Sequence, residues 1–261
     1  MDLEHVVFRV DESVATIAFD RPGAANAIDL AVARDLMHAS IRCDEDPDIR
    51  AVIVTGVGRF FSAGGDLASF SGAADVGSLL EELTTYLHAA ISRLSRMNAP
   101  VIAAVNGVAA GAGLAVVAAC DVAIAAESAS FVSAYTAAAL SPDGSSTYFL
   151  PRLVGMRRAM ELMLTNRRLR AVEAVEWGLV NRVVRDDDLE AEAHDLARTL
   201  AAGAPLAQGA VKEMLHSSFA SSLEAQMELE SRTIARLAET RDGSEGIAAF
   251  LEKRPAVFTG R

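Results

Sequence analysis

The sequence lacks the features that mark several classes of protein. Its 261 residues include only two cysteines, Cys43 and Cys120, which form no disulfide framework and fit no metal-ligand spacing. The longest apolar stretch, residues 108–119, is interrupted by glycines and is shorter than the ~18 residues that a membrane span needs. Residues 1–5 predict no signal peptide, because no basic segment precedes an apolar one. We therefore expect a soluble, cytoplasmic protein that holds no metal and binds no membrane.

Positively charged residues are also few. Lysine and arginine number 24 against 35 aspartates and glutamates, which gives a net charge of −11 and a pI of about 4.9. Such a surface repels nucleic acid, so we expect no nucleic-acid partner. An anionic ligand would have to be held by local basic groups or by the free N–H groups of helix N-termini.

The chain does contain an alternation of short apolar strands and amphipathic helices. Residues 6–19 predict two strands around a tight turn, and residues 51–56 and 101–105 predict buried parallel strands. Between them, the pattern predicts a helix from Asp29 to Cys43, with Asp29 as its N-cap, and a second helix along the leucines of residues 80–94. This order is typical of an α/β fold with a parallel sheet.

The pattern changes to helix upon helix after about residue 200. Ser221 and Glu224 have the spacing of a capping box, and the helix that follows has a mostly apolar face that includes Leu223 and Ile234. Such a face has to be buried on the chain's own core or on a neighbouring subunit. We therefore predict a core of residues 1–200 and a helical C-terminal region of residues 201–261.

Two glycine-rich segments, residues 58–67 and 105–114, have the composition of turns that stabilise a developing negative charge. Small residues there let a backbone approach another group closely. Two such turns can direct backbone N–H groups at one carbonyl oxygen. The site then needs a group that moves a proton or attacks a carbon, and Asp143 is the leading candidate. The alternative for Asp143 is a Pro-Asp-Gly turn in which the carboxylate bonds its own backbone.

Several motifs together resemble the crotonase superfamily, the enoyl-CoA hydratase/isomerase group. They are Arg21-Pro22 with Asn26-Ala27-Ile28, Phe61 to Leu67, Val101 to Gly107, Cys120-Asp121, and Gly246 to Arg261. The resemblance covers essentially the whole chain in order. It implies a spiral of ββα units, a C-terminal helical region that assembles a homotrimer or a dimer of trimers, and acyl-CoA thioester substrates. It implies no permanently bound cofactor, because coenzyme A arrives as part of the substrate.

The resemblance also assigns roles to the first glycine-rich turn and to the helix after the second. The amides of Ala63 and Ala112 match the two oxyanion donors of the family, and Ala112 falls at a helix start, where the dipole favours negative charge. The positions that continue the first turn also match the family's substrate-binding segment. They are Gly64, Gly65, Asp66 and Leu67.

Two further pairs of residues match the family's coenzyme A contacts. Ala24 and Ala25 match the segment that contacts the adenine end of CoA. Lys253 and Phe258 match a tail that helps to close the CoA pocket, often across a subunit boundary. For this second pair, a solvated lysine and a packed phenylalanine are the alternatives.

The hydratases of the family use two glutamates, and this chain has neither. The two positions correspond to Ala115 and Tyr135, which cannot perform acid–base catalysis near pH 7 as a carboxylate does. Ordinary two-glutamate hydration is therefore not expected. Asp143 matches the acidic residue of two other branches. In the isomerases an aspartate shuttles a proton, and in 4-chlorobenzoyl-CoA dehalogenase an aspartate attacks the aromatic ring.

These residues lead to three hypotheses about function. The first is an acyl-CoA isomerase, in which an oxyanion hole stabilises an enolate and Asp143 moves a proton between carbons. The second is a dehalogenase-like or hydrolytic aryl-CoA enzyme with Asp143 as nucleophile and His88 as base, in which Tyr135 stands where the dehalogenase has a tryptophan. His88 has a helix-packing role as its alternative. The third is a catalytically weak acyl-CoA-binding protein in which Asp143 serves only the turn.

Overall fold

A computed structural model describes residues 3–261, so Met1 and Asp2, the start of the predicted core, lie outside the described residues. Two sheets organise the fold. The larger sheet has the order β1-β2-β3-β5-β7-β10, with β1 antiparallel to β2 and the other pairs parallel. Its strands are Val6–Asp11, Val14–Phe19, Ala51–Gly56, Val101–Val105, Val122–Ala126 and Arg182–Val184. The strands predicted for residues 6–19, 51–56 and 101–105 are confirmed.

The smaller sheet has the order β4-β6-β8-β9, and only its β8–β9 pair is antiparallel. Its strands are Phe60–Ser62, Val108–Ala110, Ser130–Val132 and Leu169–Arg170. The chain passes repeatedly from the larger sheet to the smaller one and then towards a helix. The runs β3-β4-α2-α3 and β5-β6-α4 show this, with α2 at Leu67–Ser71, α3 at Val76–Arg96 and α4 at Ala112–Ala119. These repeats form the predicted spiral of ββα units.

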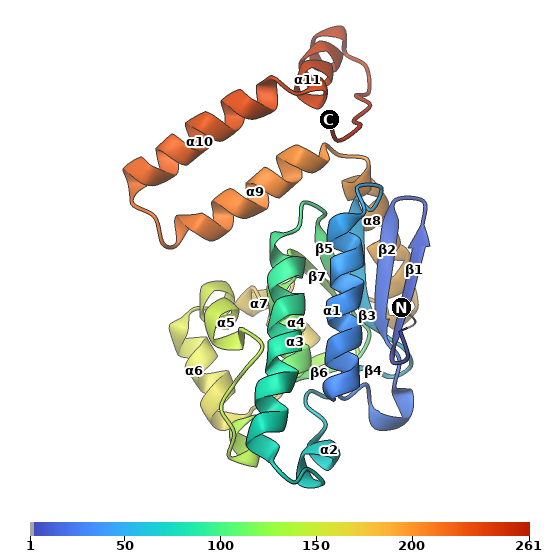
Figure 1. The fold of residues 1–261 in the computed structure, drawn as a ribbon, viewed down its shortest axis with the longest axis vertical. Helices are drawn as coiled ribbons and strands as arrows, with labels where there is room; N and C mark the ends of the chain where they lie inside the picture. Colours follow the sequence, from blue (N-terminus) through green and yellow to red (C-terminus); the bar gives the residue numbers. More distant parts are fainter. Residues whose placement is uncertain (1–2) are drawn as a thin grey trace.

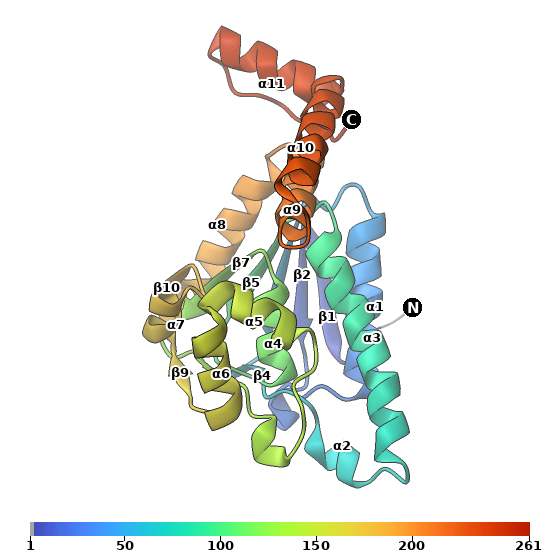
Figure 2. The same ribbon diagram turned by 90° about the vertical axis from the view of Figure 1, so that its left-hand side faces the viewer.

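Helices cover both faces of the larger sheet. Helices α1 (Leu30–Glu45) and α3 pack side by side over one face, and α8 (Leu189–Ala201) covers the other (Figures 1 and 2). Asp29 caps α1 as predicted, because its Oδ1 accepts a hydrogen bond from the Val32 N–H at 2.9 Å. The remaining helices of this part are α5 (Ser146–Val154), α6 (Met156–Thr165) and α7 (Ala171–Trp177), with short 3-10 turns at Pro22–Ala24 (η1), Thr136–Ala138 (η2) and Asp186–Asp188 (η3).

The C-terminal helices project away from this core (Figure 1). They are α9 (Pro205–Ser218), α10 (Leu223–Ala238) and α11 (Arg241–Glu252). The predicted cap at Ser221 is wrong by one residue. The hydroxyl of Ser222 accepts from the Ala225 N–H, whereas the Ser221 hydroxyl donates back to the Ser217 carbonyl. None of the helices within residues 3–261 combines the length and the hydrophobicity that a membrane-spanning segment requires.

Candidate active site

A mostly apolar cavity of about 280 Å³ lies between the two glycine-rich turns, α3 and the segment that precedes α5. Its wall combines backbone from both turns with a few polar side chains. The lining residues are Ile28, Ala63, Gly65, Leu67, Phe70, Leu80, Glu81, Leu83, Thr84, Gly111, Ala112, Ser133, Ala134, Tyr135, Ala138, Leu140, Ser141 and Asp143. A concave apolar site with a few convergent polar groups is the usual form of a small-molecule site.

Ile28 fixes the orientation of the first turn. It forms an isolated parallel bridge with Gly65, in which the Ile28 N–H donates to the Gly64 carbonyl at 2.7 Å and the Asp66 N–H donates to the Ile28 carbonyl at 3.0 Å. The residue opposite such a bridge turns its own N–H away from the neighbouring segment. Gly65 lines the cavity, and no acceptor within residues 3–261 takes its N–H. Gly65 therefore offers a free amide to a ligand.

The prediction that Ala63 supplies an oxyanion amide is wrong. The Ala63 N–H donates to the carbonyl oxygen of Ala25 at 3.0 Å, so it is not available to a thioester oxygen. The next amide, that of Gly64, donates to the Ser62 hydroxyl at 3.2 Å. Of these three successive amides only that of Gly65 stays free, because the contacts of the folded chain, and not the residue types, determine which amide is satisfied.

The second free amide lies at the start of α4. Gly111 is the N-cap, with φ 48°, and Ala112 is the first helical residue, so the Ala112 N–H has no partner inside its helix. No other acceptor among the described residues takes it. A Cβ on Gly64 would lie 2.8 Å from the Ala110 carbonyl oxygen, so glycine at that position lets the two turns touch. Both free amides thus belong to backbones in direct contact.

Tyr135 is held against Asp143 at the cavity wall. Its hydroxyl donates to Oδ1 of Asp143, and its Cζ lies 3.7 Å from the position that a Cβ on Gly111 would take. Burial and the Asp143 carboxylate raise the pKa of Tyr135 well above its usual value. The hydroxyl therefore keeps its proton and remains a donor to the carboxylate. Oδ2 of Asp143 accepts no hydrogen bond from residues 3–261.

The turn around Asp143 uses the carbonyl of this residue and not its carboxylate. The carbonyl oxygen accepts from the Ser146 N–H at 3.0 Å and from the Ser146 hydroxyl at 2.7 Å. The alternative in which the carboxylate bonds its own backbone is therefore contradicted. The carboxylate is left to face the cavity with Tyr135.

His88 supports the same loop from outside the cavity. Its Nε2 accepts a hydrogen bond from the Gly144 N–H at 3.2 Å, its side chain is exposed, and it does not line the cavity. A ring nitrogen that accepts a hydrogen bond has its lone pair engaged. This contact agrees with the packing role for His88 and leaves Nε2 without a free lone pair for activating water.

Ala115 has no space beside it for a carboxylate. The residue is fully buried, and a Cβ on Gly144 would lie 2.7 Å from the Ala115 Cβ. The same glycine position is closed by Ile91 and Leu87, at 3.5 and 3.8 Å. The loop that carries Asp143 thus packs directly over the position that corresponds to the first glutamate of the hydratases.

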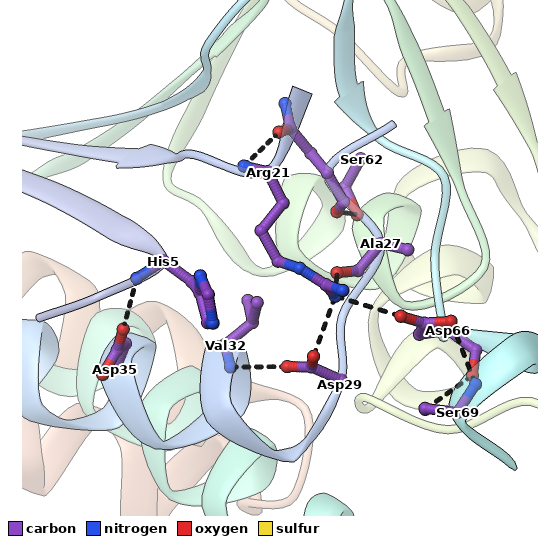
Figure 3. Close-up of polar contacts among 10 residues, drawn as sticks. His5, Arg21, Ala27, Asp29, Val32, Asp35, Ser62, Asp66 and Ser69 are labelled. Carbon is purple, nitrogen blue, oxygen red and sulfur yellow. Dashed lines mark hydrogen bonds and ion pairs between the residues drawn. The ribbon is translucent and has the colours of Figure 1, made fainter. Parts of the chain in front are cut away.

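The residues predicted to contact coenzyme A lie in two separate places. Ala24, Ala25 and residues 63–67 lie at the first turn, and Lys253 and Phe258 lie in the C-terminal region. Ala24 and Ala25 lie beside the first turn, since the Ala25 carbonyl accepts from Ala63, but neither lines the cavity. Asp66 caps α2 by accepting from the Ser69 N–H (Figure 3). Leu67 lines the cavity and is 55% exposed.

Lys253 and Phe258 are not brought to the cavity within one chain. Lys253 ends α11, and the Phe258 carbonyl accepts from Arg50 at 3.1 Å. Figure 1 shows α11 and α2 at opposite ends of the molecule. A role for the two residues across a subunit boundary stays a prediction.

Helix α3 contributes a wall of the cavity that was not predicted from the sequence. Leu80, Glu81, Leu83 and Thr84 all line the cavity. The leucines belong to the predicted apolar stripe, so helical periodicity could have identified this face. Periodicity could not indicate that residues 80, 81, 83 and 84 of this helix line a cavity, whereas Leu87, Ile91 and Leu94 pack in the core.

Comparison with known proteins identifies the family. The family model described as enoyl-CoA hydratase/isomerase matches residues 9–261. The chain belongs to the enoyl-CoA hydratase/isomerase family. Its fold is the mixed α/β fold of solved crotonase structures, with a helical C-terminal region. The enoyl-CoA hydratase from Bacillus anthracis superposes with a TM-score of 0.93 at 33% identity, over 99% of this chain and 100% of that one.

Relatives with three different activities in their names are similar to this family member to nearly the same degree. A protein from Rhodobacter capsulatus named "Probable enoyl-CoA hydratase" is 40% identical over 261 residues, the full length of both chains. The 1,2-epoxyphenylacetyl-CoA isomerase of Escherichia coli is 38% identical over 270 residues, covering 99% of this chain and 100% of its own. The 4-chlorobenzoyl coenzyme A dehalogenase-2 of an Arthrobacter species is 37% identical over 251 residues, covering 95% and 91%. Overall identity therefore does not separate the three chemistries.

Proposed function

We propose that this protein is an acyl-CoA isomerase that moves a proton between carbons of a thioester-activated acyl group. The observation that carries the proposal is the Asp143–Tyr135 pair, which lines the same cavity as the free amides of Gly65 and Ala112. The names of the relatives support a CoA thioester as substrate. The packing over Ala115 argues against hydration through two glutamates.

The proposed reaction is a proton transfer in two steps. Asp143 removes a proton from a carbon activated by the thioester, and the electrons of that C–H bond pass to the thioester oxygen as an enolate. The amides of Gly65 and Ala112 stabilise the oxyanion, and the start of α4 adds a favourable dipole. The protonated Asp143 then returns the proton to a different carbon, which shifts the double bond and regenerates the carboxylate. Tyr135 keeps its proton throughout and holds the carboxylate in place.

The test is Asp143→Asn, which removes the base and nearly preserves shape. Removing a general acid–base group should lower kcat about 10²- to 10⁴-fold. Binding of a saturated acyl-CoA should change little, because that ligand makes the same ground-state contacts. The assay should follow double-bond migration by ultraviolet absorbance and deuterium uptake from solvent into the acyl carbons. Asp187→Asn, at an exposed position outside the cavity, is the matched control. Full turnover by Asp143→Asn would contradict the proposal.

The dehalogenase-like alternative is kept because of the 37% identity to the Arthrobacter enzyme and because Oδ2 of Asp143 has no protein donor within residues 3–261. It requires an aryl ester on Asp143 during a single turnover, which mass spectrometry of the quenched enzyme would detect as added mass. It also requires a large loss of hydrolysis in His88→Ala. A panel of enoyl, dienoyl and aryl CoA thioesters separates these outcomes. Binding without any turnover across the panel would instead support a catalytically weak acyl-CoA-binding protein.

A further inference from the structure

Arg21 lies at the centre of a polar cluster with Ala27, Asp29 and Asp66 (Figure 3). It does not line the cavity. Its Nη1 donates to the Ala27 carbonyl at 2.9 Å and forms ion pairs with Oδ2 of Asp29 at 2.9 Å and Oδ2 of Asp66 at 3.1 Å. The arginine and aspartate side chains are between 14% and 21% exposed, so the cluster is mostly shielded from water. One guanidinium thus joins a loop after β2, the start of α1 and the start of α2.

The cluster joins the two segments that orient Gly65. Ala27 and Asp29 flank Ile28, and Asp66 follows Gly65, so Arg21 contacts both sides of the Ile28–Gly65 bridge. The bridge itself consists of two backbone hydrogen bonds. Gly65 has no side chain that could hold its peptide in place. Its N–H direction therefore depends on how firmly residues 27–29 and 64–66 stay together.

Asp29 and Asp66 each have a second function in this arrangement. Each uses its Oδ1 to cap a helix, α1 through the Val32 N–H and α2 through the Ser69 N–H, and each presents its Oδ2 to Arg21. The two helix starts are thereby held at fixed positions relative to the turn. Leu67, in the first turn of α2, lines the cavity, so the same cluster also fixes part of the acyl wall.

We propose that Arg21 is a positioning residue that keeps the Gly65 amide directed at the thioester oxygen. This inference rests on the proposed function only for its kinetic readout, because polarisation of a bound carbonyl can be measured without turnover. If Arg21 has a purely structural role, its replacement should lower the stability of the fold and leave the polarisation of the bound thioester unchanged. If Arg21 positions the Gly65 amide, its replacement should weaken that polarisation in a protein that is still folded.

The experiment measures the carbonyl stretching frequency of bound hexanoyl-CoA, carrying ¹³C at the thioester carbon, by infrared difference spectroscopy. In the wild-type protein two amide donors should lower this frequency relative to free hexanoyl-CoA. Arg21→Met should lose about half of the shift, and the dissociation constant should rise no more than about 3-fold, as expected when one of two preorganised donors is displaced. Arg21→Lys should recover part of the shift. Where an isomerisation substrate is found, kcat should fall about 10-fold or more while KM changes little.

Arg167→Met is the matched control, since Arg167 is also half-buried and pairs with two carboxylates, those of Glu161 and Glu173, outside the cavity. It should keep the full shift. If Arg21→Met does not fold, Asp66→Asn tests the same contact while retaining a hydrogen-bonding side chain. A full shift in a folded Arg21→Met or Asp66→Asn protein would overturn the inference, as would a wild-type protein that shows no shift. A normal wild-type shift that Arg21→Met reduces, without isomerisation of any substrate, would reject the proposed function and support the role of Arg21.

Discussion

Tyr135 orients the Asp143 carboxylate in the cavity, because its hydroxyl is the one donor to that carboxylate within the described chain. A hydrogen bond to a charged group contributes about 1.5–3 kcal/mol. Tyr135→Phe removes this donor and leaves the ring that packs beside Gly111. We expect the isomerase kcat to fall about 10-fold with little change in KM, since orientation of the base matters in the transition state.

The control for this substitution is Tyr148→Phe on α5, where the exposed tyrosine stacks on Arg152 outside the cavity. Steady-state kinetics of the two variants on one substrate checks the expectation. Equal kcat values for Tyr135→Phe and Tyr148→Phe would show that the Tyr135 hydroxyl does not contribute to catalysis by Asp143.

At the scale of residues, the sequence predicted several of the residues that line the cavity but not which backbone N–H groups lack an acceptor. The glycine-rich turns, Ala112, Tyr135 and Asp143 could be found from residue type and spacing, and all of them line one cavity. The assignment of the amide to Ala63 was wrong because Ala25, distant in sequence, accepts that N–H. The orientation of Gly65 depends on a bridge to Ile28 that no local pattern records.

At the scale of elements, local signals predicted the strands β1, β2, β3 and β5 and the start of α1. The alternation in residues 14–19 and the Asp29 cap correspond to β2 and α1, because both depend on neighbours in the sequence. The cap of α10 was placed at Ser221 instead of Ser222, since two adjacent serines carry the same local signal. The sequence could not predict how α9 is fixed to the core. That contact joins Lys212 of α9 to Asp121, which is distant from it in the sequence.

Lys212 of α9 makes that connection. Its Nζ pairs with Oδ2 of Asp121 at 2.7 Å and donates to the carbonyls of Ala99 at 3.0 Å and Leu94 at 3.2 Å. Burial raises the pKa of Asp121, and the Lys212 ammonium opposes that shift. The two side chains are only 8% and 18% exposed, so removing one partner leaves the other charge poorly solvated.

We therefore expect Lys212→Met to lower the free energy of unfolding by about 3 kcal/mol. The double variant Lys212→Met with Asp121→Asn should recover part of this loss, because it no longer leaves an unpaired carboxylate. Thermal and urea unfolding followed by circular dichroism would measure both. A double variant less stable than Lys212→Met alone would contradict the view that the unpaired charge is the main cost.

For the whole molecule, α10 and α11 expose large apolar side chains that an ordinary monomer surface would bury. Leu223 and Ile234 on α10 are 70% and 71% exposed, and Phe250 on α11 is 84% exposed. Large apolar residues gathered on projecting helices mark an association surface. The homotrimer or dimer of trimers expected from the family resemblance stays a prediction, and such an assembly would bury this surface.

Light scattering after size-exclusion chromatography should therefore give three or six times the 27.5 kDa mass of the chain. Leu223→Glu combined with Ile234→Glu places charges on the apolar face of α10 and should lower the mass, whereas Val10→Glu, on the exposed valine of β1, should not.

The dissociated variant also tests the prediction for the tail. If Lys253 and Phe258 close the CoA pocket of a neighbouring subunit, dissociation should weaken acyl-CoA binding about 10-fold or more, a loss of at least 1.4 kcal/mol. A monomer that binds acyl-CoA as tightly as the wild type would exclude that role and leave the two residues as part of the C-terminal fold.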